Sequence, residues 1–379
     1  MNILTVKIGG SILVEPESYY VVADKIARLS MDKEAKIIVV VSAMKSITDE
    51  LLHAYEKRVK PVNVYERYLK AAQYIGGRKL FNNIRKLLGA LDKYLTLRDR
   101  NEWLKPLVLS FGERISKLLL VGALQSNSNL RIKSIEAVNV IVTESKPDNA
   151  RIIYRLTKRN LYHMLLKHLV ENDIIVIEGY IGSTVEGRIS TLGRGGSDYT
   201  ATTISALLGI PKTYIYTDVP GILSGDPKYI PNPKRVPRLS FNEAYEASLH
   251  GVKKLHPRTF EPLIHIPRVK IYIGSLKDEF TIISNNYTNT SITNHSFKII
   301  TPPKSNGQEC AKITLIGEYS NEKIVLNKIR ELLRKHGLQD ININLTRDRP
   351  AVDFYVPKEA VLPYMRFLHD NIIVHGVGS

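Results

Sequence analysis

Two short apolar runs near the start of the chain constrain its fold more than any other feature. They are ILTVKIGGSI over residues 3–12 and AKIIVVVSAM over residues 35–44. Both are rich in β-branched residues, and the second is almost continuously apolar, which is typical of a parallel strand buried on both faces. Between them Val22, Ile26 and Leu29 recur at helical spacing. The sequence therefore predicts a β-α-β unit, whose two strands are parallel.

The same alternation continues along most of the chain. Further strands are expected over residues 107–110, 131–142, 173–182, 212–222 and 268–275. Helical patterns separate them, over residues 62–105, 112–125, 151–171 and 198–208. Alternating strands and helices predict an α/β fold with a mainly parallel central sheet.

The pattern changes after residue 285. Residues 286–308 are polar and include a Pro-Pro step, so they are expected to form a linker that carries one strand. Residues 309–379 then follow the order β-α-β-β-α-β, with a last strand expected over 371–378, which is the ferredoxin-like α+β arrangement. A chain of 379 residues favours two domains. The predicted boundaries are a large domain over 1–285, the linker over 286–308, and a small domain over 309–379.

Composition indicates a soluble protein. Hydrophobic residues make up 44% and charged residues 24% of the chain, and no apolar run is long enough to span a bilayer. The N-terminal residues lack a basic segment and a cleavage site, so no signal peptide is expected. The single cysteine, Cys310, excludes an intramolecular disulfide. We therefore expect a cytoplasmic protein with no membrane partner.

The net charge is +17. Excess basicity can indicate a nucleic-acid partner. Here, however, Lys and Arg are spread along the whole chain, and no basic motif is interleaved with aromatic residues. We therefore expect anionic small molecules, and no nucleic acid, as the partners.

The segment KIGGS follows the first expected strand. Gly9 and Gly10 would let backbone amides approach phosphate oxygens, and Lys7 could neutralise charge on a phosphoryl group in transfer. The alternative is a simple strand-to-helix turn with a solvated lysine.

The segment TLGRGGSDYTA precedes an expected helix. Its three glycines and the helix N-terminus could bind an anion, and Arg194 could hold a carboxylate. Asp198 could orient a lysine or a Mg²⁺-bound water. Alternatively, Ser197 or Asp198 is an N-cap and Gly209 ends the helix, although a cap does not explain the run Gly-Arg-Gly-Gly.

Glu113 in LSFGERIS has two interpretations. With Ser110 it matches an S-x-x-E capping box at a junction between strand and helix. A carboxylate at such a junction could instead bind a substrate amine, and the residues alone leave both open.

Taken together, these segments resemble the aspartate kinases of the amino acid kinase superfamily. Six blocks carry the resemblance in the order of that family: VKIGGS, VVVSAMKSITDELL, LSFGERIS, EGYIGSTVEGRISTLGRGGSDYTA, TDVPGILSGDPKYIPNPKRVPRLSFNEA and GVKKLHPRTFEPL. The resemblance covers most of residues 4–285. It implies the three-layer fold of that superfamily, followed by an ACT-like domain.

The resemblance also implies roles for particular residues. Lys7 matches the catalytic lysine and Asp198 the residue that organises it. On the substrate side, Glu113 matches the acceptor of the ammonium group, and the remaining matches are Ser42, Thr48, Arg194 and Ser197. The residues implied for ATP are Lys7, Gly9, Gly10, Ser11, Thr217, Asp218, Asp226, Lys228 and Lys253. No protein metal site is implied.

The implied reaction transfers a phosphoryl group from Mg-ATP to L-aspartate, giving 4-phospho-L-aspartate on the route to lysine, threonine and methionine. The sequence departs from the family in KIGGSI, in Lys45 where a glycine is usual, and in having one ACT-like unit where two are typical. The effector loop expected there is replaced by GEYSNEKIV. The resemblance therefore does not identify lysine or threonine as a feedback inhibitor of this chain. The small domain is expected to mediate assembly of a homo-oligomer.

Three other interpretations stay open. A superfamily kinase for acetylglutamate, glutamate or uridylate would share the phosphate site but is less expected to combine SFGERIS with TLGRGGSDYTA. The short C-terminus could indicate a regulatory subunit, although the intact Lys7, Glu113, Arg194 and Asp198 argue against it. A basic nucleic-acid-binding protein is the third.

Overall fold

The computed structural model divides into two compact units. It describes residues 2–263, 266, 268–285, 296–306, 310–318, 322–337, 341–345 and 349–374. The first unit comprises the residues up to 218 together with 261–278, and the second comprises 219–260 and the residues from 279 onward. The predicted domain boundaries at 285 and 309 stay a prediction. In the described part of the chain, every helix is too short or too polar to cross a membrane.

A parallel sheet forms the centre of the first unit. Six strands of this sheet lie in the first unit and run in the order β3-β5-β2-β1-β8-β10, and each neighbouring pair is parallel. Their bounds are β1 Ile3–Ile8, β2 Lys36–Val41, β3 Ile132–Ile135, β5 Ile174–Glu178, β8 Lys212–Tyr216 and β10 Lys270–Gly274. Residues 37–41 of β2 and 174–178 of β5 are completely buried, as expected for strands covered on both faces. The predicted mainly parallel α/β fold is confirmed.

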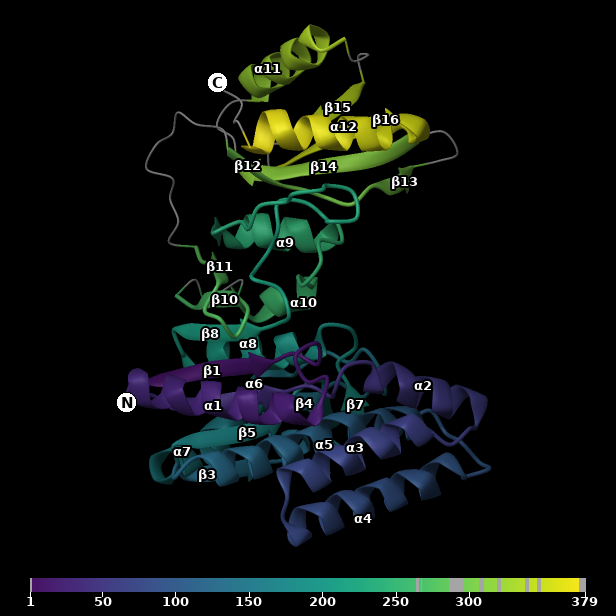
Figure 1. The fold of residues 1–379 in the computed structure, drawn as a ribbon, viewed down its shortest axis with the longest axis vertical. Helices are drawn as coiled ribbons and strands as arrows, with labels where there is room; N and C mark the ends of the chain where they lie inside the picture. The colour runs from purple at the N-terminus through teal and green to yellow at the C-terminus, as the bar shows by residue number, and fades with distance from the viewer. Residues whose placement is uncertain are drawn as a thin grey trace. The chain divides into compact units, whose positions relative to one another are not determined.

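Helices cover both faces of this sheet (Figure 1). Their bounds are α1 Pro16–Asp32, α2 Ile47–Lys57, α3 Val62–Ile75, α4 Arg78–Leu95, α5 Leu104–Asn127, α6 Tyr154–Asn160, α7 Lys167–Glu171 and α8 Gly196–Leu208, with a π-helical turn over Leu161–Leu166. One face packs on α8 and the α6–α7 stretch through a core that includes Ile38, Ile175 and Ile204. On the other face α1 and α5 contact the sheet, and α3 and α4 form an outer layer over α5.

A small three-stranded sheet lies in the same unit. Its strands are β4 Val142–Thr143, β6 Ile181–Thr184 and β7 Ile189–Thr191. The order is β4-β6-β7, with β6 and β7 antiparallel. This hairpin carries the chain from β5 to the glycine-rich segment before α8.

The strand expected over residues 107–110 is wrong. These residues lie inside the single helix α5, and the Ser110 hydroxyl donates to the carbonyl of Leu107 at 2.7 Å. The capping box of Ser110 with Glu113 is therefore also wrong. A short apolar run does not distinguish a strand from a buried helix, and α5 is buried almost all round here.

The second unit contains a five-stranded antiparallel sheet. The order is β12-β14-β16-β15, and β13 also pairs with β14. The bounds are β9 Arg238–Leu239, α9 Phe241–Leu249, α10 Pro257–Phe260, β11 Phe280–Ile283, β12 Ser296–Ile300, β13 Lys304–Asn306, β14 Cys310–Glu318, α11 Glu322–Lys335, β15 Asn342–Leu345, β16 Ala351–Pro357 and α12 Val361–Leu368. Ile313, Phe354, Leu333 and Met365 join the sheet to α11 and α12. This is the expected α+β arrangement, with two exceptions. The first is that the expected linker over 286–308 carries two strands, β12 and β13, rather than one.

The last strand expected over residues 371–378 is wrong. His369–Val374 continue α12 as a π-helical segment, and residues 375–379 lie outside the described residues. The edge of β14 that a final ferredoxin-like strand would occupy is taken by β12, which pairs with it antiparallel. A strand from the expected linker thus replaces a strand from the end of the chain.

Candidate active site

The candidate site lies at the carboxyl edge of the parallel sheet. Gly9 N donates to Tyr216 O at 3.1 Å, and Ser42 N donates to Ile8 O at 3.1 Å. Gly179 N donates to Val41 O at 2.9 Å. These bonds bring the segments after β1, β2, β5 and β8 together, because parallel strands end at the same edge.

An ion pair joins β1 to α8 at this edge. Lys7 Nζ lies 2.7 Å from Asp198 Oδ1, and the two side chains are 12% and 16% exposed. α8 begins after Gly195, whose φ of 73° lies in the left-handed region, and no side chain caps the helix. The interpretation of Ser197 or Asp198 as N-cap is therefore wrong, and Asp198 is available to hold Lys7.

The end of α8 is as expected. Gly209 has a φ of 67°, and Ile210 N donates to Ser205 O at 2.9 Å. Both features are typical of a glycine-terminated helix. At the other end of α8, Gly196, Ser197 and Asp198 line the site, so the helix N-terminus and its positive potential face it.

The Gly-Gly pair after β1 has no room for side chains. A Cβ on Gly10 would lie 2.5 Å from Ala43 O. A Cβ on Gly9 would lie 3.0 Å from Tyr216 O and 3.3 Å from Lys7 Nζ. The segment therefore presents bare backbone beside the lysine, as a phosphate cradle requires.

Glu113 is a buried carboxyl on α5. Its Oε1 accepts a long bond from Ala43 N at 3.4 Å, and Oε2 has no hydrogen-bond partner among the described residues. Burial raises the pKa of Glu113 to about 8, with a smaller contribution from the nearby Glu178. An unsatisfied buried carboxyl is costly, so this group is suited to receive a cationic ligand.

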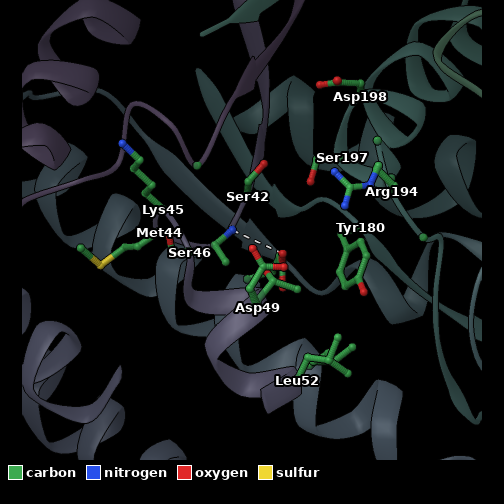
Figure 2. A pocket seen from close by; sticks show the side chains of 18 of the residues that line it. Ser42, Met44, Lys45, Ser46, Asp49, Leu52, Tyr180, Arg194, Ser197 and Asp198 are labelled. Carbon is green, nitrogen blue, oxygen red and sulfur yellow. Dashed lines mark hydrogen bonds between the residues drawn. The ribbon is translucent and has the colours of Figure 1, made fainter. Parts of the chain in front are cut away.

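A cavity of about 670 Å³ connects these groups (Figure 2). Its lining includes all the predicted catalytic and substrate-binding residues, namely Lys7, Ser42, Thr48, Glu113, Arg194, Ser197 and Asp198, and two of the residues predicted for ATP, Gly10 and Ser11. Arg194 is exposed and has no ion-pair partner in the described part of the chain. Ser197 packs on Gly179, where a Cβ would lie 2.5 Å from the serine Cβ. The cavity thus has an unpaired cation and an unsatisfied carboxyl on its walls.

Two predicted ATP residues lie beside this cavity. Thr217 follows β8, and its hydroxyl donates to Asp218 Oδ1 at 2.9 Å. The Ser11 hydroxyl is 3.4 Å from that of Thr217. Hydroxyl and carboxylate oxygens therefore gather next to the glycine cradle.

The other predicted ATP residues belong to the second unit. Lys253 Nζ lies 3.0 Å from Asp226 Oδ2, and Lys228 N donates to Asp226 Oδ1 at 3.0 Å. Desolvation of the Asp226 carboxyl opposes ionisation, but these partners hold its pKa below the ordinary value. The three residues form one cluster, and their role in binding ATP stays a prediction.

Sequence reasoning missed several lining residues. Lys105 Nζ lies 3.0 Å from Asp148 Oδ2, although 43 residues separate them and no motif links them. Tyr180 lines the cavity with a φ of 68°, which is unusual for a residue with a side chain. No signal in the sequence indicates this turn, because Tyr180 lies inside the single strand expected over residues 173–182, which the structure divides into β5 and β6.

The fold and this site define the class of protein. The model of the amino acid kinase family matches residues 2–275, and the chain belongs to that family. Within it the chain is similar to the aspartokinase of Geobacillus stearothermophilus, with 30% identity over 261 residues that cover 69% of this chain and 53% of the relative. It is 34% identical to aspartokinase 2, chloroplastic, of Arabidopsis thaliana over 68% of this chain and 49% of the relative. The predicted resemblance is confirmed.

The solved structures agree on the fold. The E. coli aspartokinase III in complex with aspartate and ADP superposes with a TM-score of 0.79 at 23% identity, covering 98% of this chain and 100% of that one. The chain spans between 33% and 56% of the length of four curated relatives, and 71% of the length of the aspartokinase of Rickettsia prowazekii.

Proposed function

We propose that the chain is an aspartate kinase. It transfers the γ-phosphoryl group of ATP to the side-chain carboxylate of L-aspartate, giving 4-phospho-L-aspartate and ADP. A carboxylate oxygen forms the new P–O bond while the bond to the ADP oxygen breaks. The observation that carries the proposal is the pairing of Lys7 with Asp198 at the rim of a cavity that also holds Glu113 and Arg194.

The cavity walls match the charges of an amino acid. The carboxyl of Glu113 has an oxygen with no partner in the described structure, which suits the substrate ammonium. Arg194 is an exposed cation and suits the α-carboxylate through a bidentate contact. Ser42, Thr48 and Ser197 supply hydroxyls between them. Relatives named aspartokinase, one of them solved with aspartate and ADP, support this assignment.

The chemistry suits the residues on the donor side. An ionised carboxylate needs no general base, so catalysis consists of positioning two anions and reducing their repulsion. Lys7 is held by Asp198 toward the transferring phosphoryl group, and the Gly9–Gly10 backbone and the N-terminus of α8 supply amides.

The oxygen-rich groups fit a nucleotide-bound Mg²⁺. Among the described residues no three His, Cys, Asp or Glu side chains form a metal site of their own. The oxygens of Ser11, Thr217 and Asp218, next to a cradle that a Cβ would fill, are the ligand type that this hard cation prefers. When bound, Mg-ATP supplies the phosphoryl group and offsets part of its charge.

The test is acceptor-dependent ADP release. Mg-ATP is supplied with L-aspartate, and L-glutamate, N-acetyl-L-glutamate and UMP serve as comparison acceptors. Hydroxylamine should trap an acyl phosphate as the hydroxamate with L-aspartate alone. Turnover only with another acceptor would retain the phosphate site and overturn the substrate assignment. No turnover with any of the four would overturn the proposed activity.

A further inference from the structure

The excess positive charge of the chain is concentrated in one segment. Residues 57–100 contain twelve Lys and Arg against three Asp and Glu, a net charge of +9 out of the total of +17. Lys and Arg occur along the whole chain, but about half of the excess of cations over anions lies in this one segment. This segment contains the hairpin of α3 and α4, the outer layer of the first unit (Figure 1), together with the residues that flank it.

One face of α4 carries the most regular part of this charge. At 3.6 residues per turn, five cations fall within an arc of about 120° and extend over roughly 22 Å of helix. All five are exposed, and we call them the α4 face: Arg78, Lys79, Arg85, Lys86 and Lys93. The opposite side of the helix holds the buried Ile84, Leu88, Leu91 and Leu95, which anchor it to the unit.

The α4 face lacks neutralising partners. In the part of the chain that the structure describes, ion pairs of this segment use Lys60 with Asp92 and Arg67 with Glu50, and none involves the α4 face. None of its residues lines the candidate active site. The kinase chemistry proposed above therefore gives no reason for this charge.

The composition of the face distinguishes between anionic partners. α4 exposes no large apolar side chain among its described residues, so it has nothing to insert into a lipid interface. The same absence argues against a protein partner, because stable protein interfaces centre on desolvated apolar or aromatic anchors. It also offers no ring for stacking unpaired bases.

We propose that the α4 face binds the phosphate backbone of double-helical nucleic acid. A duplex presents a dense, regular row of negative charges, which rigidly spaced Lys and Arg side chains can contact without reading bases. Binding would be independent of sequence and strongly dependent on salt. This inference does not depend on the substrate of the kinase site.

Two matched variants of the full chain test the proposal. The first is R78Q/K79Q/R85Q/K86Q/K93Q on the α4 face. The second is K33Q/R155Q/K158Q/R159Q/K167Q, which replaces the same number of Arg and Lys at exposed positions elsewhere in the same unit. Both variants lower the net charge by the same amount. Glutamine has a helix propensity close to those of lysine and arginine, so the substitutions should preserve the helices. Circular dichroism and acceptor-dependent ADP release check that each variant is folded.

Fluorescence anisotropy with labelled RNA and DNA duplexes is the measurement. The unmodified chain should bind both, with a slope of log K against log salt of about −4 to −5 for five phosphate contacts. The α4-face variant should lose at least about tenfold in affinity and most of that slope, while the control variant should lose far less. Equal losses in both variants would overturn the proposal, because net charge alone would then explain binding. Absence of duplex binding, or tighter binding to phosphatidylserine vesicles or a poly-glutamate peptide, would overturn it as well.

Discussion

Lys7 on β1 and Asp198 in the first turn of α8 form an ion pair of 2.7 Å, although 191 positions separate them in the chain. The strand ends at the carboxyl edge of the sheet and the helix begins there, so the fold places both residues without a long loop. Because α8 is started by Gly195 rather than by a side-chain cap, the Asp198 carboxylate is available to orient the lysine. In the proposed function, this pair joins the phosphate side of the site to its substrate side.

Replacing Lys7 by alanine should lower turnover by about 10²–10³-fold or more, since a preorganised cation at the transferring phosphoryl group would be lost. Steady-state ADP release measures this effect. Lys25→Ala is the control, because Lys25 pairs with Asp278 at 2.6 Å and does not line the cavity. Near-normal turnover of Lys7→Ala would contradict the assignment.

Glu113 should make aspartate binding dependent on pH. Its pKa of about 8 leaves it mostly protonated at pH 7, and only its ionised form attracts the substrate ammonium. We expect kcat/KM for aspartate to rise with pH through a midpoint near pH 8, with this rise absent in Glu113→Gln. A flat profile of the unmodified enzyme between pH 6.5 and 8.5 would contradict the role of Glu113.

The same group should affect stability in the opposite direction. A folded-state pKa above the ordinary value of 4.5 means that the contribution of Glu113 to stability is fully present below pH 4.5 and is lost as pH rises toward 8. Glu113→Gln removes this loss and should stabilise the fold by about 3 kcal/mol at pH 7. Denaturant unfolding at pH 5 and pH 7 should show a gain that is larger at pH 7. An equal gain at both pH values would indicate that ionisation is not the cause.

The sequence predicted those parts of the site that lie directly beside a strand end or a helix start. Lys7 and Ser42 follow this rule, because a parallel sheet collects the residues after its strands at one edge. Lys105 and Asp148 could not be found in this way, since their pairing depends on how α5 packs against the loop before α6. Tyr180 was missed for a similar reason, because its left-handed backbone depends on tertiary contacts.

The two misassigned strands have a common physical cause. Residues 107–110 and 371–374 are apolar runs, and such runs suit a buried helix as well as a strand. Whether such a run forms a helix or a strand depends on which other elements pack or pair beside it in the fold. For the second run, β12 already pairs with the available edge of β14.

Gly10→Ala should weaken ATP binding by steric means. The new Cβ would lie 2.5 Å from Ala43 O, and backbone cannot yield as a flexible side chain can, so the cradle must open. We expect at least a tenfold rise in KM for ATP together with lower stability, measured by ADP release and thermal unfolding. The control is Gly89→Ala in α4, where the Cβ meets nothing within 4 Å and alanine should stabilise the helix by about 1 kcal/mol. Unchanged ATP affinity in Gly10→Ala would contradict a phosphate role for this turn.

A buried charge cluster lies one helical turn beyond Glu113. Lys117, which is 1% exposed, contacts Glu136 and lies 2.6 Å from Glu178 Oε1, which is fully buried. Desolvation raises the pKa of Glu178 to about 7, and Ala137 N donates to its second oxygen at 2.8 Å. The cluster ties α5 to the end of β5, just before the Gly179–Tyr180 turn at the cavity wall.

Lys117→Met should therefore destabilise the fold by about 3–5 kcal/mol, because it leaves a buried carboxylate without its cation. The double variant Lys117→Met/Glu178→Gln removes both charges and retains an acceptor for Ala137 N, so it should recover at least half of that loss. Urea unfolding measures the stability of both variants. Lys60→Met is the control, because the exposed pair of Lys60 with Asp92 should contribute less than about 1 kcal/mol to stability. If the double variant is no more stable than Lys117→Met alone, the lysine stabilises through packing of its stem rather than by compensating Glu178.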